Sequence, residues 1–143
     1  MWAYFDSSAL VKRYIEETGR REVLQLLRRY DVVTSTILPI ELRGAMRRRA
    51  AEGTLDAPRL PEILKRIAMD RAYWTLVEVG SAVLAGAETL VATHPLRTLD
   101  AIHVASAQLF AAHIKAEDSI FVSADHRQTD VATVLGLNVR LIV

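Results

Sequence analysis

The sequence predicts a single α/β domain in which a five-stranded parallel sheet is covered by helices on both faces. Two observations predict this class. Short apolar runs alternate with helical patterns along the whole chain. Each run is apolar at consecutive positions rather than at alternate ones, which indicates strands buried on both faces. The length of 143 residues fits one domain spanning 1–143, and no repeat or linker divides it.

The first half of the chain is expected to begin with a buried strand that stops at Asp6. Ser7 or Ser8 is expected to cap the helix that follows, and Gly19 to separate that helix from the next. Pro39 suits the first turn of a helix. The expected strands are 2–5 and 32–34, and the expected helices are 7–17, 20–30, 39–53 and 57–71.

The second half continues the alternation. Thr98 is expected to cap a long helix that follows the loop around His94. Gly136 is expected to end the last helix, which starts after Asp125. The expected strands are 74–77, 120–122 and 139–143, and the expected helices are 80–91, 98–113 and about 126–135.

Composition limits the chemistry that the chain can perform. There is no cysteine, which excludes disulfides, thiolate metal sites and cysteine nucleophiles. The four histidines show no close ligand spacing, so a metal would be held mainly by oxygen, and this favours Mg²⁺ or Mn²⁺. No apolar run is long enough to span a membrane, and the opening residues lack the features of a signal peptide. We therefore expect a cytoplasmic protein without a membrane segment.

The balance of charge is compatible with an anionic partner but does not require one. Net charge is only +1, yet the chain has 15 arginines and 3 lysines. The planar guanidinium group suits phosphate and carboxylate partners better than an ammonium group does. The codon bias of a GC-rich genome would explain the same excess equally well.

Four acidic residues are expected to meet at one edge of the sheet. Asp6 ends the first strand, and Asp125 lies just past the fourth. Glu41 and Asp100 lie in the first turns of their helices. Each alone has an ordinary explanation as a helix cap or as a partner of the helix dipole. Because the carboxyl ends of parallel strands share one edge and clustered carboxylates repel, the four together predict a site for a divalent cation.

Basic residues lie beside one of these acids. Arg48 follows Glu41 by seven positions, and Arg43 and Arg47 flank the same helix. Gly44 and Ala45, at the third and fourth positions after the acid, share its helical face and are small enough to leave room for a metal or a phosphodiester beside the carboxylate. The stripe is either a phosphate-binding surface or a solvated basic face.

Hydroxyl and imidazole groups adjoin the predicted site. Ser7, Ser8 and Ser123 stand next to the acids at the strand ends, where they would orient carboxylates or act only as caps. His103 is three residues after Asp100, so it either reaches the site or is a buried hydrogen-bonded side chain. None of the histidines is identified as a general base.

Four segments, in order along nearly the whole chain, resemble the motifs of PIN-domain proteins. They are MWAYFDSSALVKRYIEE, TILPIELRGAMRRR, LRTLDAIHVASA and SIFVSADHRQTDVATVLGLNV. The resemblance makes Asp6, Glu41, Asp100 and Asp125 the four acids of the family's site. The chain differs at Ser123, where many relatives have threonine, and at Asp130, where many have a small residue.

The resemblance implies a three-layer α/β/α sandwich with strand order 3-2-1-4-5. The short chain is similar to VapC toxins of toxin–antitoxin systems, which implies Mg²⁺- or Mn²⁺-dependent cleavage of RNA, dimerisation and inhibition by a VapB-type antitoxin. Asp6 and Asp100 would be the nearest metal ligands, and Glu41 and Asp125 would act directly or through water. With an activated water as the nucleophile, the products would carry 5′-phosphate and 3′-hydroxyl ends.

Other parallel α/β families fit less well. Receiver domains need a pair of acids after the first strand, and dehalogenase-type phosphatases need Asp-x-Asp there. Dinucleotide-binding domains need a glycine-rich turn at the same place. The segment Asp6-Ser7-Ser8 has none of these features. A nuclease acting on DNA flaps would need a helical insertion that the chain lacks. The main alternative to an active ribonuclease is a catalytically inactive PIN-like module with an RNA-binding or regulatory role.

Overall fold

A computed structural model describes residues 1–143 with the exception of the side chain of Ala116. All five strands pair in parallel, in the order β3-β2-β1-β4-β5, which confirms the predicted sheet. The strands are β1 (Trp2–Phe5), β2 (Asp31–Ser35), β3 (Thr75–Val77), β4 (Ser119–Ser123) and β5 (Val139–Leu141).

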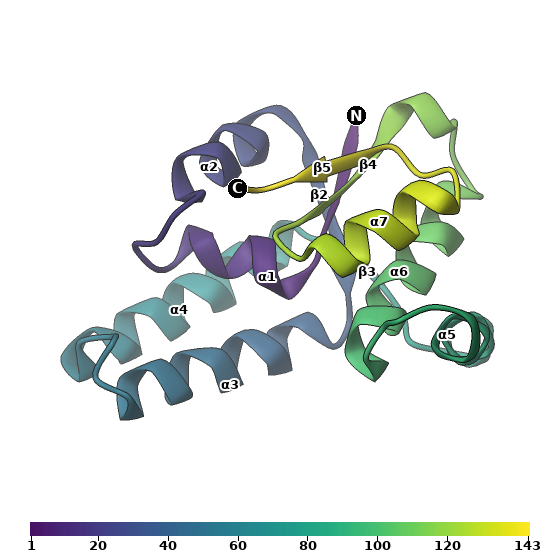
Figure 1. Cartoon of the computed structure of the whole chain (residues 1–143). Coiled ribbons are helices and arrows are strands. Elements are labelled where there is room, and N and C mark those ends of the chain that lie inside the picture. Colours follow the sequence, from purple (N-terminus) through teal and green to yellow (C-terminus); the bar gives the residue numbers. More distant parts are fainter.

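Helices cover both faces of the sheet (Figure 1). The α-helices are α1 (Ser7–Leu10), α2 (Arg20–Arg29), α3 (Leu38–Ala51), α4 (Leu60–Asp70), α5 (Ser81–Thr93), α6 (Thr98–Ala111) and α7 (His126–Val134). Short 3₁₀ turns are η1 (Val11–Arg13), η2 (Ala57–Arg59), η3 (Arg71–Tyr73) and η4 (Ala116–Asp118). In the part of the chain that the structure describes, no helix is both long and apolar enough to cross a membrane.

Two apolar cores lie on opposite faces of the sheet. Phe5 packs with helices α1 to α4, including Leu42 and Met46 of α3. Its neighbour Tyr4 packs on the other side with Phe121 of β4 and with helices α5 to α7. Because consecutive side chains of a strand point to opposite faces, one short apolar run supplies both cores. The predicted three-layer sandwich is confirmed.

The helix predicted over 7–17 is much shorter than expected, and that prediction was wrong. Helix α1 ends at Leu10 and continues only as the turn η1. The Nη1 atom of Arg20 donates to the carbonyl oxygens of Arg13 at 2.7 Å and Ile15 at 3.2 Å. The side chain of Arg20 therefore satisfies carbonyls that further helical turns would have used, and the chain turns back towards α2.

The caps of two helices also differ from the prediction, and both differences involve acids of the site. Asp6 rather than Ser7 or Ser8 caps α1, since its Oδ1 accepts the backbone N–H of Ala9 at 3.0 Å. Thr98 is the first residue of α6, not its cap. The residue before it, Arg97, donates its backbone N–H to Asp100 Oδ2 at 3.4 Å. These carboxylates are thus fixed at helix N-termini by backbone N–H groups.

Candidate active site

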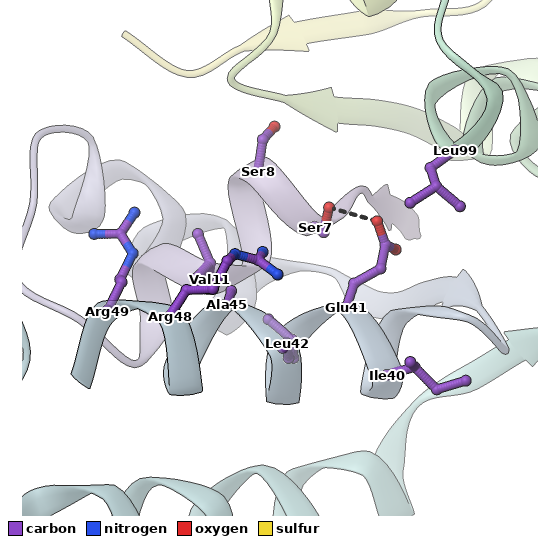
Figure 2. Close-up of a pocket in the computed structure, with 11 residues that line it drawn as sticks. Ser7, Ser8, Val11, Ile40, Glu41, Leu42, Ala45, Arg48, Arg49 and Leu99 are labelled. Carbon is purple, nitrogen blue, oxygen red and sulfur yellow. Dashed lines mark hydrogen bonds between the residues drawn. The ribbon is translucent and has the colours of Figure 1, made fainter. Parts of the chain in front are cut away.

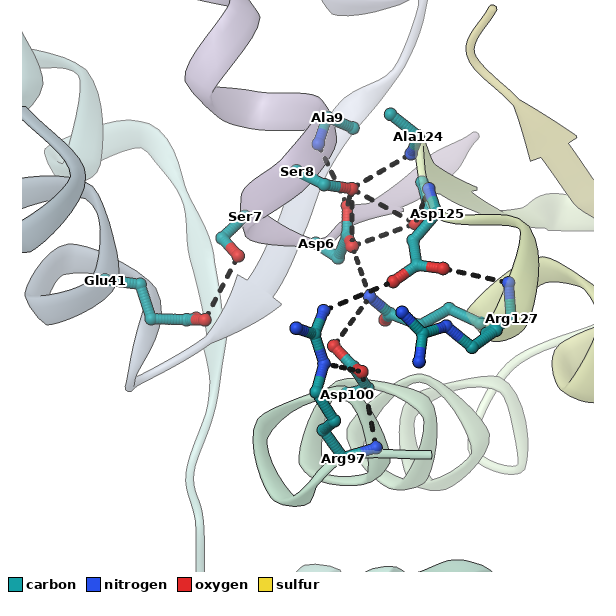
Figure 3. A network of polar contacts seen from close by, with 12 residues as sticks. Asp6, Ser7, Ser8, Ala9, Glu41, Arg97, Asp100, Ala124, Asp125 and Arg127 are labelled. Atoms are coloured by element: carbon teal, nitrogen blue, oxygen red, sulfur yellow. Dashed lines mark hydrogen bonds and ion pairs between the residues drawn. The ribbon is translucent and has the colours of Figure 1, made fainter. Parts of the chain in front are cut away.

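Asp6 is fully buried at the end of β1 and is surrounded by donors. The hydroxyl of Ser8 donates to both of its oxygens at 2.8 Å, and the hydroxyl of Ser123 donates to Oδ2 at 2.8 Å. The amide nitrogen of Gln128 donates to Oδ2 at 2.7 Å. With the backbone N–H of Ala9, these groups hold the carboxylate in one orientation (Figure 3).

The electrostatic environment of Asp6 opposes its charge. Burial raises the pKa of Asp6, while the charge of His103 and the hydrogen bonds from Ser8, Ala9 and Ser123 lower it again without restoring its ordinary value. A positive charge next to Asp6 would therefore stabilise the ionised form of this carboxylate.

Asp100 and Asp125 are joined to Asp6 through two donor side chains. The Nε2 atom of Gln128 also donates to Asp100 Oδ1 at 3.2 Å, so that one amide group bridges Asp6 and Asp100. The guanidinium group of Arg97 donates to Asp100 Oδ2 at 3.2 Å and lies 3.7 Å from Asp125 Oδ2. The hydrogen bond with Asp100 raises the pKa of Arg97, whose side chain is 70% exposed (Figure 3).

Glu41 lies to one side of the other three acids (Figure 3). Its Oε2 accepts the hydroxyl of Ser7 at 3.0 Å, and its Oε1 is 2.6 Å from Nε2 of the buried His103. The other ring nitrogen, Nδ1, is 2.9 Å from the hydroxyl of Tyr4. Burial raises the pKa of Tyr4 well above its ordinary value, so the phenol keeps its proton while it is hydrogen-bonded to Nδ1. Because a carboxylate only accepts, the imidazole donates through Nε2 to Glu41.

An open cavity of about 440 Å³ adjoins Glu41 between α1 and α3 (Figure 2). Gly44 and Ala45 line it, as their small size predicts. Of the three arginines predicted to bind phosphate, Arg48 lines the cavity. Arg43 and Arg47 are exposed and are not among its lining residues. The cavity therefore presents the Glu41 carboxylate and, about two helical turns further along α3, the guanidinium groups of Arg48 and Arg49.

Comparison with known proteins places this chain in a family. A model of the PIN domain matches residues 3–134. The chain belongs to the PIN domain family. PIN domains are generally nucleases, and those nucleases generally use divalent metals. No curated protein matches the chain.

Two solved structures share the PIN fold of this chain. One is a toxin–antitoxin complex from Klebsiella pneumoniae, with a TM-score of 0.64, 18% identity and 88% of each chain covered. The other is VapBC2 from Rickettsia felis bound to a DNA fragment from its promoter, with a TM-score of 0.65, 11% identity, and 99% of this chain and 98% of that chain covered. At these identities the likeness shows the fold.

The candidate site links its acids through intervening donors. Gln128 joins Asp6 to Asp100, and Arg97 joins Asp100 to Asp125. Glu41 contacts Ser7 and His103 instead. Among the described residues, no group of three or more acidic or histidine side chains is close enough to hold a metal ion.

Sequence reasoning did not identify two residues that contact these acids, Gln128 and Arg97. Gln128, Val131 and Ala132 are all buried on α7, at the spacing of one helical face. That spacing is visible in the sequence and would have placed Gln128 towards the core. Arg97 lies three residues before Asp100, within reach of a carboxylate in the first turn of α6.

The carboxylate oxygens of the candidate site are ligands of the kind that a divalent cation prefers. The acids offer oxygen ligands only, which suit Mg²⁺ or Mn²⁺. The groups that now lie between them are the electropositive end of the Gln128 amide and the guanidinium group of Arg97. The Oε1 atom of Gln128 is buried and finds no hydrogen-bond partner among the described residues. Asp6 and Asp100 would hold the cation most directly.

Proposed function

We propose that this PIN domain is the toxin of a type II toxin–antitoxin system, a Mg²⁺- or Mn²⁺-dependent endoribonuclease that acts in the cytoplasm. One observation carries most of the proposal. Two carboxylates from distant parts of the chain, Asp6 and Asp100, face a single donor atom at the carboxyl edge of a parallel sheet. In open parallel sheets this edge is where ligands bind.

The side chains of the site have separate roles in this proposal. When bound, the cation supplies a water of lowered pKa and a positive charge beside the phosphodiester. Asp6 and Asp100 would hold it, and Glu41 and Asp125 would act on it directly or through water. Ser7 and Ser123 fix the carboxylates of Glu41 and Asp6, respectively. Arg97 and Arg48 are both exposed, and in this proposal they would bind phosphate oxygens of RNA.

The proposed partners are a VapB-type antitoxin and a second copy of the chain. Support for the antitoxin comes from the two solved structures, one of them named a toxin–antitoxin complex and the other a VapBC complex on promoter DNA. Support for RNA as the substrate comes from the nuclease family and from the arginine beside Glu41.

The direct test is cleavage of RNA by the purified protein with Mg²⁺, with Mn²⁺ and with EDTA, followed by sequencing of the RNA ends. We expect cleavage only with a divalent ion, and 5′-phosphate and 3′-hydroxyl ends. Ends carrying 2′,3′-cyclic phosphate would contradict an attacking water. RNA binding without any cleavage under all three conditions would instead favour an inactive RNA-binding module.

The placement of Arg48 gives a prediction about RNA binding. Arg48→Ala is expected to weaken binding roughly fivefold to tenfold and to lower the slope of log affinity against log salt by about one, the change for one lost phosphate contact. Fluorescence anisotropy with a labelled RNA in EDTA, at several salt concentrations, would measure both quantities.

Arg47→Ala provides a matched control, since Arg47 precedes Arg48 on α3, is exposed and does not line the cavity. Its affinity and salt slope are expected to stay near those of the wild type. Equal losses of RNA affinity in the two variants would show that RNA binds along the whole basic face of α3 and not specifically at the cavity.

A further inference from the structure

The side chain of Gln128 is oriented in an unusual way for a buried amide. It is 3% exposed, and its Nε2 atom donates to Asp6 at 2.7 Å and to Asp100 at 3.2 Å. Its Oε1 atom is also buried but has no hydrogen-bond partner in the part of the chain that the structure describes. Since buried acceptors are nearly always satisfied, an unpartnered oxygen beside two carboxylates calls for an explanation.

The orientation of this amide is determined by the charge of its neighbours. Without a cation, Nε2 is drawn to the carboxylates of Asp6 and Asp100, because the reverse orientation would put Oε1 against two acceptors. The unpartnered Oε1 is a consequence of that preference. The amide nitrogen therefore takes the place of a positive charge between the two acids.

A divalent cation would reverse this preference. Once the oxygens of Asp6 and Asp100 share a cation, they accept the hydrogens of Nε2 more weakly, and the positive charge repels those hydrogens. Oε1 is an oxygen ligand of the kind that Mg²⁺ accepts, and no hydrogen bond from the described residues holds it in place. The oxygen and nitrogen of an amide have nearly the same size, so a half-turn about the last side-chain bond exchanges them without repacking α7.

We propose that Gln128 is a cation-responsive positioning residue, whose amide nitrogen holds Asp6 and Asp100 together in the metal-free protein and whose amide oxygen turns towards the cation when it binds. This proposal rests on the proposed metal-dependent function. The carboxylate of Asp6 is fixed independently by Ser8 and Ser123, so the amide can turn while this ligand stays in position.

The composition of the chain makes the amide directly observable by NMR. The sequence has three glutamines, at positions 25, 108 and 128, and one asparagine, Asn138. Four side-chain amide groups are therefore expected in the spectrum of ¹⁵N-labelled protein. Gln25→Ala and Gln108→Ala would assign two of them without changing the site, and the amide of Asn138 lies beside Ser119 rather than beside the acids.

The experiment is a titration of EDTA-treated wild-type protein with Mg²⁺. In the metal-free protein both Nε2 protons of Gln128 are expected downfield of those of Gln25, because both face carboxylates. At Mg²⁺ saturation they are expected to move upfield, while the amide groups of Gln25 and Gln108 stay unchanged. The backbone N–H groups of Ala9 and Arg127, which donate to Asp6 and Asp125, report cation binding independently.

These reporters separate the two proposals. If the Ala9 and Arg127 signals shift on Mg²⁺ addition while the Gln128 protons stay downfield, the Gln128 amide does not turn when the cation binds. The proposed metal site would still be supported. If the Ala9 and Arg127 signals do not respond to Mg²⁺ and are not broadened by Mn²⁺, the protein does not bind a cation at these acids. That result would contradict both the proposed metal site and the proposed turn of the Gln128 amide.

Discussion

The Asp6→Asn variant is expected to keep its fold and to lose RNA cleavage by roughly a thousandfold or more, which corresponds to about 4 kcal/mol of the activation barrier. Asparagine removes the negative charge and replaces one carboxylate oxygen by an amide nitrogen, which is a poor ligand for the proposed cation. Asparagine caps helices as well as aspartate does, so the hydrogen bond from Ala9 can persist. The hydroxyls of Ser8 and Ser123 can rotate to accept from the new amide.

Burial makes the charge of Asp6 a cost in the metal-free protein, because it raises the pKa of this carboxyl group. The loss of that charge therefore offsets the less favourable hydrogen bonds of asparagine. Cleavage rates, circular dichroism and thermal unfolding would be measured together. The exposed Asp56→Asn is a matched control with the same chemical change, and its cleavage rate is expected to stay at the wild-type value. Wild-type cleavage by a folded Asp6→Asn protein would remove this carboxylate from the mechanism.

The strand-end acids could be predicted from sequence because each follows a pattern with a direct geometric meaning. Asp6 comes straight after a buried apolar run, and Asp125 follows another. Parallel pairing then places both at the same edge. Neutral Gln128 carries no such signal when taken alone. Its role depends on α7 packing its first turn over that edge, which is a property of the tertiary structure.

The difference between the predicted helix 7–17 and the shorter α1 also results from the tertiary structure. Residues 7–17 have a helical pattern, but the carbonyls that would continue the helix are bound by Arg20, a residue that local periodicity does not connect to them. Tyr14 is likewise held from a distance, since its hydroxyl donates to Asp70 on α4 at 2.9 Å. Long-range side-chain contacts of this kind override local helix propensity.

His103 is expected to act on catalysis only through Glu41. The chain of contacts from Tyr4 through His103 ends on Glu41 Oε1, and His103 itself is buried with no exposed edge from which to reach RNA. Replacing a side chain that orients a metal-binding carboxylate typically costs about tenfold to a hundredfold in activity or metal affinity. We therefore expect His103→Phe, which keeps a ring but removes the donor, to lower cleavage within that range.

A double-mutant cycle distinguishes positioning from general loss of stability. Glu41→Gln keeps an oxygen that accepts from His103 but removes the charge, so we expect the larger loss of cleavage, at least about a hundredfold. If His103 acts through Glu41, the double variant cleaves no more slowly than Glu41→Gln alone, because neighbouring sites in one network are not additive. Losses that multiply would show that His103 supports the active site by another route, such as packing against Tyr4. Thermal unfolding of all three variants ensures that folded proteins are compared, and the cycle then measures the coupling between a buried histidine and the carboxylate it orients.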